Sequence, residues 1–307
     1  MTVLVTGATG FVGSEVVRNL VAAGEDVAVI TLPGSLLHRL DGVVDRVRVL
    51  EGDLGDGAGI ARLLERCRPD ACIHAAWYAE PGKYLTSSHN LDSLRSSLDL
   101  LENLARAGCT HVVGVGTCFE YELQTGPLKE DSPTRPSTLY AAAKLAFYLV
   151  AAQRAAQLGM GFGWARLFYL YGPHEDERRL VPAAIKALIS GREFLAVSGE
   201  HVRDYLHVAD VASGLCALSR HRLDGVFNVC SSEPVTIADL LRTLVDLLGR
   251  PELVRMGALP SRDWDPPYVC GDNQRLRTEA NWAPGYALRD GLAHTISWWK
   301  EAGWRVP

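Results

Sequence analysis

Tyr140 and Lys144 are the two residues whose types and spacing most clearly suggest chemistry. They stand four residues apart in Tyr140-Ala-Ala-Ala-Lys144, within a stretch that has a helical pattern, so both side chains lie on one helix face. A free tyrosine has a pKa near ~10. A neighbouring ammonium group would lower that pKa toward a value suited to proton transfer. The pair therefore predicts acid–base chemistry at a carbonyl or alcohol oxygen.

Thr117 is a third candidate, because it ends the apolar run Val112–Gly116. That run has the composition of a buried strand, which places the polar residues 117–121 at the strand's carboxyl end. Cys118 lacks a partner base and is expected to be a small packing residue. Glu120 is expected either to hydrogen-bond a substrate hydroxyl or to orient the loop.

The first residues of the chain carry a glycine pattern typical of a dinucleotide site. Gly7, Gly10 and Gly13 follow the apolar run Val3–Thr6 and open a helical stretch. Glycine lets the backbone approach a pyrophosphate, whose charge the helix N-terminus attracts. Glycines also make simple turns, but the strand-turn-helix order favours the dinucleotide. We expect these residues of the loop to contact the cofactor: Gly7, Gly10, Phe11 and Val12.

The second strand, Val27–Thr31, lacks the acidic residue that usually ends it in NAD sites. This absence removes repulsion of a 2′-phosphate, which Ser35 and Arg39 could bind, and so favours NADP(H) over NAD(H). Arg39 as a solvated helix residue fits the sequence equally well. Asp53, after the third strand, could bind the adenine amino group or serve as a turn or N-cap residue.

In chain order, these residues resemble a known family. The series runs Gly7/Gly10/Gly13, Asp53-Leu54, His74-Ala75-Ala76, Thr117-x-x-x-Tyr121, Tyr140-x-x-x-Lys144, Arg203-Asp-Tyr-Leu-His207-Val and Asn228-Val. It resembles the extended short-chain dehydrogenase/reductase family, the NAD-dependent epimerases and dehydratases that act on nucleotide sugars. The resemblance covers essentially the whole chain, to Ile296–Trp299.

The resemblance implies a role for each of these side chains. Thr117 and Tyr140 would contact the substrate oxygen, and Lys144 the nicotinamide ribose. Arg203 and Arg262 would approach the nucleotide diphosphate, whose oxygens a planar guanidinium binds in pairs; a surface salt bridge is the alternative for Arg262. Further cofactor contacts are expected from Ser35, Arg39, Asp53, Leu54, Ala75, Ala76 and Trp77, and substrate contacts from Tyr78, Glu120, Tyr169, Arg203 and Arg262.

Two departures from the family pattern concern the substrate. Tyr169 stands where the family often has asparagine, and the distinctive segment Trp77–Tyr84 is expected at the substrate mouth. The positions after Thr117 distinguish reactions. Sugar 4,6-dehydratases follow the threonine with Asp-Glu, whereas Cys118 and Phe119 cannot expel water. Dual-function epimerase-reductases carry cysteine two places after the hydroxyl, where this chain has Phe119.

The remaining triad suffices for hydride transfer at a carbonyl. We therefore expect an NAD(P)H-dependent reductase of the C4 carbonyl of a nucleotide-linked 4-keto-6-deoxyhexose, dTDP-linked, in deoxysugar biosynthesis. A nucleotide-sugar 4-epimerase that retains NAD is the alternative within the same chemistry. A catalytically silent NADP-sensing regulator is the alternative from another class, and a non-sugar carbonyl reductase also fits.

The elements that must position these residues alternate between strands and helices in the first half. Such alternation predicts right-handed crossovers and an α/β fold, a doubly wound parallel (Rossmann) sheet. We assign residues 1–167 to this domain and 168–307 to a smaller C-terminal α/β substrate-binding lobe, with some segments passing back. Expected strands are Val3–Thr6, Val27–Thr31, Val47–Leu50, Ala71–Ala75, Val112–Gly116 and Gly163–Leu167. Expected helices span 11–23, 57–67, 85–107, 138–158, 180–190, 237–248 and 287–301.

Composition limits the partners. The net charge of −5 and pI near 6.0 argue against nucleic acid or an anionic membrane surface. No run approaches the ~18 apolar residues of a membrane span, and the N-terminal residues do not resemble a signal peptide. Seven scattered cysteines indicate buried thiols in a cytoplasmic protein, with no metal site. Pairing through helices 85–107 and 138–158 into a homodimer is expected by family resemblance.

Overall fold

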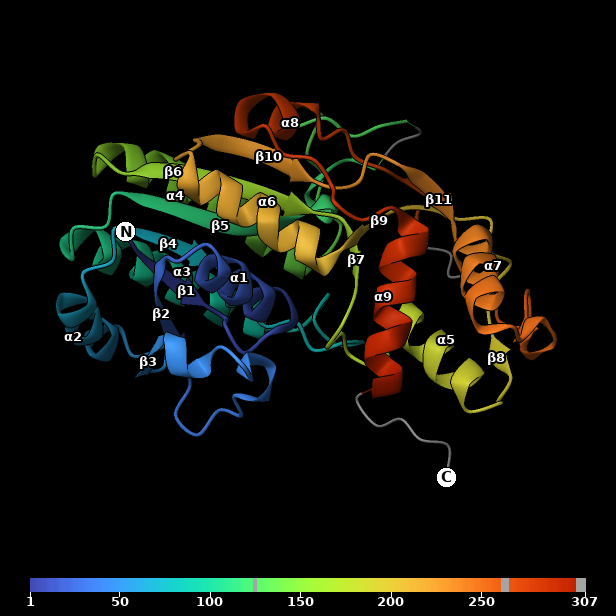
Figure 1. Ribbon diagram of the computed structural model, residues 1–307. Coiled ribbons are helices and arrows are strands. Elements are labelled where there is room, and N and C mark those ends of the chain that lie inside the picture. The colour runs from blue at the N-terminus through green and yellow to red at the C-terminus, as the bar shows by residue number, and fades with distance from the viewer. Residues whose placement is uncertain (124–125, 261–264, 302–307) are drawn as a thin grey trace.

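In the computed structural model, which describes residues 1–123, 126–260 and 265–301, the chain folds around a seven-stranded parallel sheet. The strand order is β10-β6-β5-β4-β1-β2-β3 (Figure 1), so the chain reverses direction of travel along the sheet after β3. The strands are β1 (Thr2–Thr6), β2 (Asp26–Thr31), β3 (Arg48–Glu51), β4 (Ala71–His74), β5 (His111–Thr117), β6 (Gly161–Leu167) and β10 (Gly225–Val229).

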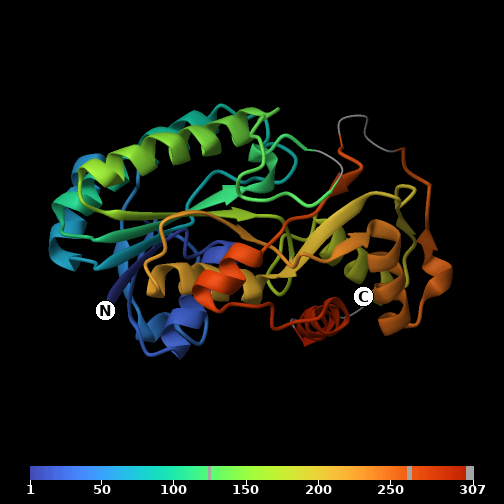
Figure 2. The ribbon, with the colours of Figure 1, turned by 90° about the horizontal axis from the view of Figure 1, so that it is seen from above.

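Helices cover both faces of this sheet. One face carries α1 (Phe11–Ala22) and α6 (Val208–Arg220), and the other carries α2 (Gly57–Cys67), α3 (His89–Arg106) and α4 (Leu139–Gln157). Figure 2 shows the green α4 and the gold α6 on opposite sides of the sheet. This arrangement confirms the predicted doubly wound α/β fold.

The central strand β1 shows why the sequence folds this way. Val3 and Val5 belong to the core cluster that includes α1 and α6, whereas Leu4 belongs to the cluster that includes α2, α3 and α4. All three side chains are fully buried. A strand covered on both faces reads as a continuous apolar run rather than an alternating one, as this strand does.

The second lobe lies beside the carboxyl ends of the large sheet (Figure 1). In it β9 pairs with β7, β11 and β13, while β8 pairs with β12. The lobe consists of β7 (Tyr169–Tyr171), β8 (Phe194–Leu195), β9 (Val202–His207), β11 (Pro234–Thr236), β12 (Val254–Arg255), β13 (Tyr268–Val269), α5 (Leu180–Ile189), α7 (Ile237–Leu248) and α9 (Leu288–Glu301).

Parts of the second half of the sequence return to the large sheet. Strand β10 pairs with β6, α6 covers the sheet, and α8 (Gln274–Ala280) packs near β10. The sequence did not indicate α6, because most of its residues are buried and it has no broad polar face. Short 3₁₀ helices are η1 (His38–Leu40), η2 (Val44–Arg46), η3 (Cys118–Glu120) and η4 (Pro251–Leu253).

The helices and strands that the sequence predicted begin and end within a few residues of their predicted bounds. The largest difference is at α3, which begins at His89 rather than near residue 85. None of the helices in the described residues combines the length and the apolar character needed to span a bilayer.

Candidate active site

A cavity of about 1190 Å³ lies where the carboxyl ends of β1, β2, β4 and β5 meet the second lobe. This is the crevice in which open α/β sheets bind their ligands. The predicted residues that line it are Gly7, Gly10, Phe11, Val12, Ser35, Arg39, Asp53, Leu54, Ala75, Ala76, Trp77, Tyr78, Thr117, Tyr140, Lys144, Tyr169 and Arg203.

The glycine loop is shaped to admit a phosphate. Gly7 has a φ of +70°, and a Cβ there would lie 2.7 Å from the backbone N of Ala76. A Cβ on Gly13 would overlap the Gly7 carbonyl oxygen. Gly10 is the N-cap of α1, and among the described residues no side chain caps this helix. The first-turn N–H groups are thus left for an anionic ligand, and the loop fits a dinucleotide.

His74, the last residue of β4, joins the end of β1 to α3 through buried hydrogen bonds. Its Nδ1 lies 2.7 Å from the Thr6 hydroxyl and its Nε2 lies 2.8 Å from the Ser97 hydroxyl. The Thr6 hydroxyl also accepts a hydrogen bond from the backbone N–H of Ala76. Burial lowers the pKa of His74 to about 3, so the imidazole stays neutral and acts as a structural link beneath the cavity.

Arg39 connects the glycine loop to the second lobe. Its Nη1 donates to the Thr9 carbonyl at 3.2 Å and its Nη2 to the His174 carbonyl at 3.1 Å. Its Nε is buried with no hydrogen-bond partner among the described residues. Arg39 is therefore not the solvated residue that the sequence also allowed. Two of its donors already hold the backbone, which leaves less of the guanidinium for a 2′-phosphate.

The sequence left two roles open for Asp53 after β3: a contact with the adenine amino group, and a turn or N-cap role. The Asp53 carboxylate accepts from the Gly55 N–H at 2.8 Å in a turn, and Asp53 also lines the cavity. The N-cap of α2 is Asp56, which accepts from the Gly59 N–H. Asp53 is thus free of the N-cap role and remains placed for a ligand.

Thr117 ends β5 and caps the 3₁₀ helix η3. Its hydroxyl accepts from the Phe119 N–H at 3.3 Å, and the Glu120 carboxylate accepts from the Thr117 N–H at 2.9 Å. This reciprocal capping box fixes the threonine at the strand end. The Thr117 side chain is thereby held at the carboxyl end of β5, on the cavity wall.

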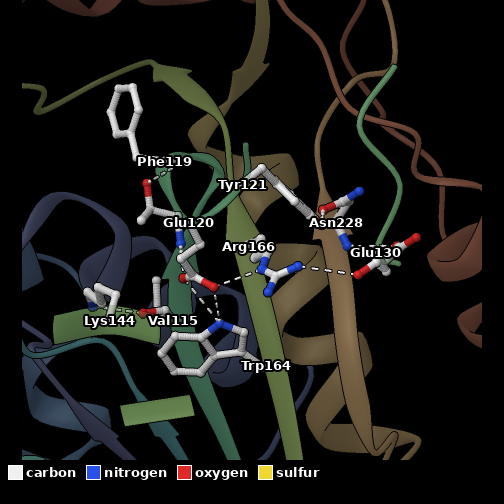
Figure 3. A network of polar contacts seen from close by, with 10 residues as sticks. Val115, Phe119, Glu120, Tyr121, Glu130, Lys144, Trp164, Arg166 and Asn228 are labelled. Carbon is white, nitrogen blue, oxygen red and sulfur yellow. Dashed lines mark hydrogen bonds and ion pairs between the residues drawn. The ribbon is translucent and has the colours of Figure 1, made fainter. Parts of the chain in front are cut away.

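Glu120 lies beneath the cavity rather than on its wall. Figure 3 shows its carboxylate between the Trp164 indole and the Arg166 guanidinium, with Arg166 Nε donating at 2.8 Å and Trp164 Nε1 at 3.0 Å. The residue is fully buried. Burial raises the pKa of Glu120, and Arg166 opposes the rise. This position does not support the expected substrate contact and favours the alternative of orienting the loop.

Tyr140 stands in the first turn of α4. The helix begins where Thr138 caps the Ala141 N–H, and the Tyr140 N–H donates to the Leu85 carbonyl at 3.1 Å. Burial raises the pKa of Tyr140 above its ordinary value, and hydrogen bonding with the Thr117 side chain opposes the rise. The lowered pKa expected from the sequence is not produced by the protein's own groups. The phenol keeps its proton at neutral pH.

Lys144 follows one helical turn later, with its Nζ 6.0 Å from the centre of the Tyr140 ring. The Nζ donates to the Val115 carbonyl at 2.7 Å and lies 3.9 Å from the centre of the Trp77 ring. Burial lowers the pKa of Lys144 to about 7, and Glu120 opposes the change. A lysine held in this way can change its charge near neutral pH.

Arg203 comes from β9 of the second lobe and also lines the cavity. Its side chain is 2% exposed, and its Nη2 donates to Asp265 Oδ1 at 2.7 Å. The Tyr169 ring lies over it, with the guanidinium carbon 5.1 Å from the ring centre, and Phe119 packs edge-on against Tyr169. The second lobe thus places a buried cation in the cavity, beside a carboxylate that the sequence did not single out.

Other predicted and unpredicted residues complete the wall. Arg262 lies outside the described residues. Sequence reasoning did not single out Glu175 or Arg179, although both lie in the charged run 174–179 directly after a strand, a position where ligand contacts gather. The guanidinium carbon of Arg179 lies 5.3 Å from the centre of the Tyr84 ring, and that ring packs edge-on against Tyr140 at 4.8 Å.

Cys118 is 2% exposed, and burial raises its pKa to about 12, so it is not a nucleophile at neutral pH. Across the described residues, no three His, Cys, Asp or Glu side chains gather in a way that could hold a metal ion.

The fold is that of dinucleotide-binding α/β proteins, and Thr117, Tyr140 and Lys144 line one cavity together with the glycine loop. A sequence profile of the NAD dependent epimerase/dehydratase family matches residues 3–230. The chain therefore belongs to this family of enzymes, which confirms the resemblance drawn from its motifs.

Relatives within the family carry out different reactions. The chain is 28% identical to a UDP-glucose 4-epimerase of Azospirillum brasilense, over 98% of this chain and 92% of that protein. It is 29% identical to a dTDP-glucose 4,6-dehydratase of Streptomyces griseus, over 99% and 96%. The UDP-glucose 4-epimerase of Thermus thermophilus, solved in complex with NAD, superposes with a TM-score of 0.87 at 25% identity and covers 98% of this chain and 100% of its own.

Proposed function

We propose that the protein transfers hydride to C4 of a nucleotide-linked hexose, reducing a 4-keto-6-deoxy sugar with NAD(P)H. One observation carries the proposal: Thr117, Tyr140 and Lys144 meet on one wall of a cavity that the glycine loop also lines. The two positions after Thr117 hold Cys118 and Phe119, which cannot supply the acid and base of an elimination.

The chain's own residues account for the proton. A bound nicotinamide would supply the hydride. The Tyr140 phenol, whose pKa is raised by burial, holds the proton that the forming alkoxide needs. The Thr117 hydroxyl is fixed by the capping box and shares the substrate oxygen with Tyr140. Lys144 would hydrogen-bond the nicotinamide ribose from its position beside Trp77.

Nucleotide recognition falls to the second lobe. Arg203 is the cation for the diphosphate, because its guanidinium is buried on the cavity wall and a diphosphate could replace or share its present partner, Asp265. The proposal names a dTDP-linked sugar, in keeping with deoxysugar biosynthesis.

A 4-epimerase that retains its cofactor is the second candidate. The same three catalytic residues serve that reaction, and relatives named UDP-glucose 4-epimerases match the chain over 98% of its length. The two candidates differ in whether cofactor is consumed.

The deciding experiment incubates the protein with dTDP-4-keto-6-deoxyglucose and either NADPH or NADH. The reductase is supported if the absorbance of NADPH or NADH falls in proportion to the substrate consumed and a 4-hydroxy sugar is formed. Isomerisation of UDP-glucose or dTDP-glucose without net absorbance change supports the epimerase. Absence of both activities across a panel of keto-sugars and keto-alcohols would leave the NADP-sensing regulator.

Cofactor choice can be resolved by substituting Arg39. The protein is proposed to prefer NADPH, since no acidic side chain ends β2. If Arg39 binds the 2′-phosphate, Arg39→Met lowers kcat/KM for NADPH by about tenfold or more and leaves NADH nearly unchanged, as loss of a charge-assisted hydrogen bond predicts. Equal losses for both cofactors would mean that Arg39 acts only through the Thr9 and His174 carbonyls.

We also propose a homodimer that pairs α3 and α4 with their copies. These helices pack side by side on the outer face of the sheet (Figure 2), and Leu91, Leu149 and Val150 expose apolar side chains there. Sedimentation equilibrium of wild type and Leu149→Lys tests this: the variant is expected to shift toward monomer.

A further inference from the structure

Glu175 is a carboxyl on the cavity wall that the catalytic triad does not use. It belongs to the loop that joins β7 to α5. Figure 1 shows this loop running between the large sheet and the second lobe. The Oε2 atom of Glu175 is shielded from solvent and has no hydrogen-bond partner among the described residues. An unsatisfied buried polar group lowers the stability of the fold. A group of this kind in a ligand cavity points to a partner that arrives with the ligand.

Other buried carboxylates in the chain are well supplied with donors. Asp204 accepts hydrogen bonds from the Ser231 N–H and hydroxyl and from the Gly271 N–H. Glu120 accepts from two side chains and one backbone N–H. The Oε2 of Glu175 is an exception to this pattern: it is shielded from solvent and unpartnered, in a half-buried residue that also lines the cavity.

The loop that carries Glu175 is anchored on both sides. Arg39 donates to the carbonyl of His174, whose φ of +66° turns the chain, and the His174 ring packs on Trp298 at 4.4 Å. On the other side Arg178 pairs with Asp176. These contacts fix the loop that carries the Glu175 carboxyl.

The surroundings of Glu175 select the kind of group it can bind. Burial raises the pKa of Glu175 well above its usual range, and Arg179 opposes the rise while Asp176 adds to it. A protonated carboxyl offers one donor and one acceptor, which matches a hydroxyl. It does not match a phosphate, which needs cations or several donors.

The same wall leads from Glu175 to the reacting group. Arg179 lies over the Tyr84 ring, and the Tyr84 ring packs against Tyr140. Glu175 lines the same cavity as these three residues, and we place the sugar along this wall.

We propose that Glu175 recognises the sugar itself, hydrogen-bonding a hydroxyl of the hexose in the bound nucleotide sugar. The inference rests on the proposed function and adds a specificity residue to it. The chemical class it selects is a hexose with a free hydroxyl at the position facing this loop.

The test compares dTDP-glucose with dTDP, measured by titration calorimetry on the full chain loaded with cofactor. Glu175→Leu is expected to weaken dTDP-glucose binding about tenfold and dTDP binding less than twofold, since only the sugar contact is lost. Glu175→Gln, which keeps a donor and an acceptor, should restore affinity for dTDP-glucose to within about threefold of wild type.

Glu177→Gln is the matched control, because Glu177 is an exposed residue of the same loop that pairs with Lys186 away from the cavity wall. It should leave both affinities unchanged. Equal losses for dTDP-glucose and dTDP in Glu175→Leu, or no loss in either, would overturn the inference while leaving the proposed function in place. A wild-type protein that binds dTDP-glucose no better than dTDP would also overturn the inference, whereas the proposed function is overturned by absence of keto-sugar reduction.

Discussion

At the scale of single residues, the site depends on charged and polar groups held where water does not reach them. The Lys144 amine lies on the Trp77 ring, 3% of the residue is exposed, and its pKa falls to about 7 because of burial. Burial raises the pKa of Tyr140, so that the phenol keeps its proton. Such displaced pKa values are typical of functional sites, and they cost stability.

Lys144→Met should therefore give a more stable but inactive protein. The folded-state pKa of about 7 lies below the usual 10.5, so the unfolded chain binds more protons between these values. The penalty is complete below pH 7 and fades as pH rises toward 10.5. Thermal and urea unfolding should show the variant more stable by roughly 1–4 kcal/mol near pH 6, with a difference that shrinks at higher pH. A less stable variant, or a widening difference, would contradict this.

Glu120→Gln separates the two roles that the sequence left open for this residue. The substitution removes the partner charge of buried Arg166, which should lower the free energy of unfolding by about 3 kcal/mol. The Gln oxygen can still accept from the Thr117 N–H, so kcat and KM measured below the unfolding temperature should change less than about threefold. A large rise in KM with unchanged stability would instead indicate a substrate contact.

At the scale of elements, strand ends and helix starts place the chemistry. Strand β5 delivers Thr117, the first turns of α4 deliver Tyr140 and Lys144, and the turn between β1 and α1 delivers the glycine loop. Thr117, Tyr140 and the glycine loop lie where one element ends and the next begins, and Lys144 follows one helical turn after Tyr140. Loops and element ends positioned by a rigid sheet are the usual carriers of function.

Gly7→Ala tests the glycine loop, with Gly24→Ala as its control. Both glycines have a left-handed φ, +70° and +77°, but a Cβ on Gly24 would meet nothing within 4 Å. Gly24→Ala should cost about 1–2 kcal/mol of stability and leave cofactor binding unchanged. Gly7→Ala adds a clash with the Ala76 backbone and should weaken NAD(P)H binding by about 10²-fold, measured by fluorescence titration. Similar binding in both variants would show that the loop does not hold the cofactor.

At the scale of the whole molecule, the site exists because two lobes meet. The large sheet supplies the triad and the glycine loop, while β9 and the loop before α5 supply Arg203, Glu175 and Arg179. Arg39 joins the lobes through the Thr9 and His174 carbonyls. The proposed reacting groups and the proposed recognition groups therefore come from parts of the chain that local sequence cannot bring together.

The sequence predicted the parts whose signals are local. The apolar run of β1 and the glycines after it could be read directly, as could Tyr140 and Lys144 on one helix face. The sequence could not predict the part of the cavity wall that Glu175 and Asp265 contribute, because these residues follow no periodic pattern and their placement depends on long-range contacts. The sequence left two roles open for Glu120, because its partner, Arg166, is 46 residues away in the next strand.

The central claim is that Tyr140 donates the proton in hydride transfer to a nucleotide-linked keto-sugar. Its most direct test measures Tyr140→Phe against wild type, with dTDP-4-keto-6-deoxyglucose and NADPH or NADH, and measures cofactor affinity in parallel. The account predicts nearly unchanged cofactor binding and a turnover lowered by about 10²-fold or more, as loss of a general acid requires. A Tyr140→Phe variant that turns over at the wild-type rate would contradict it.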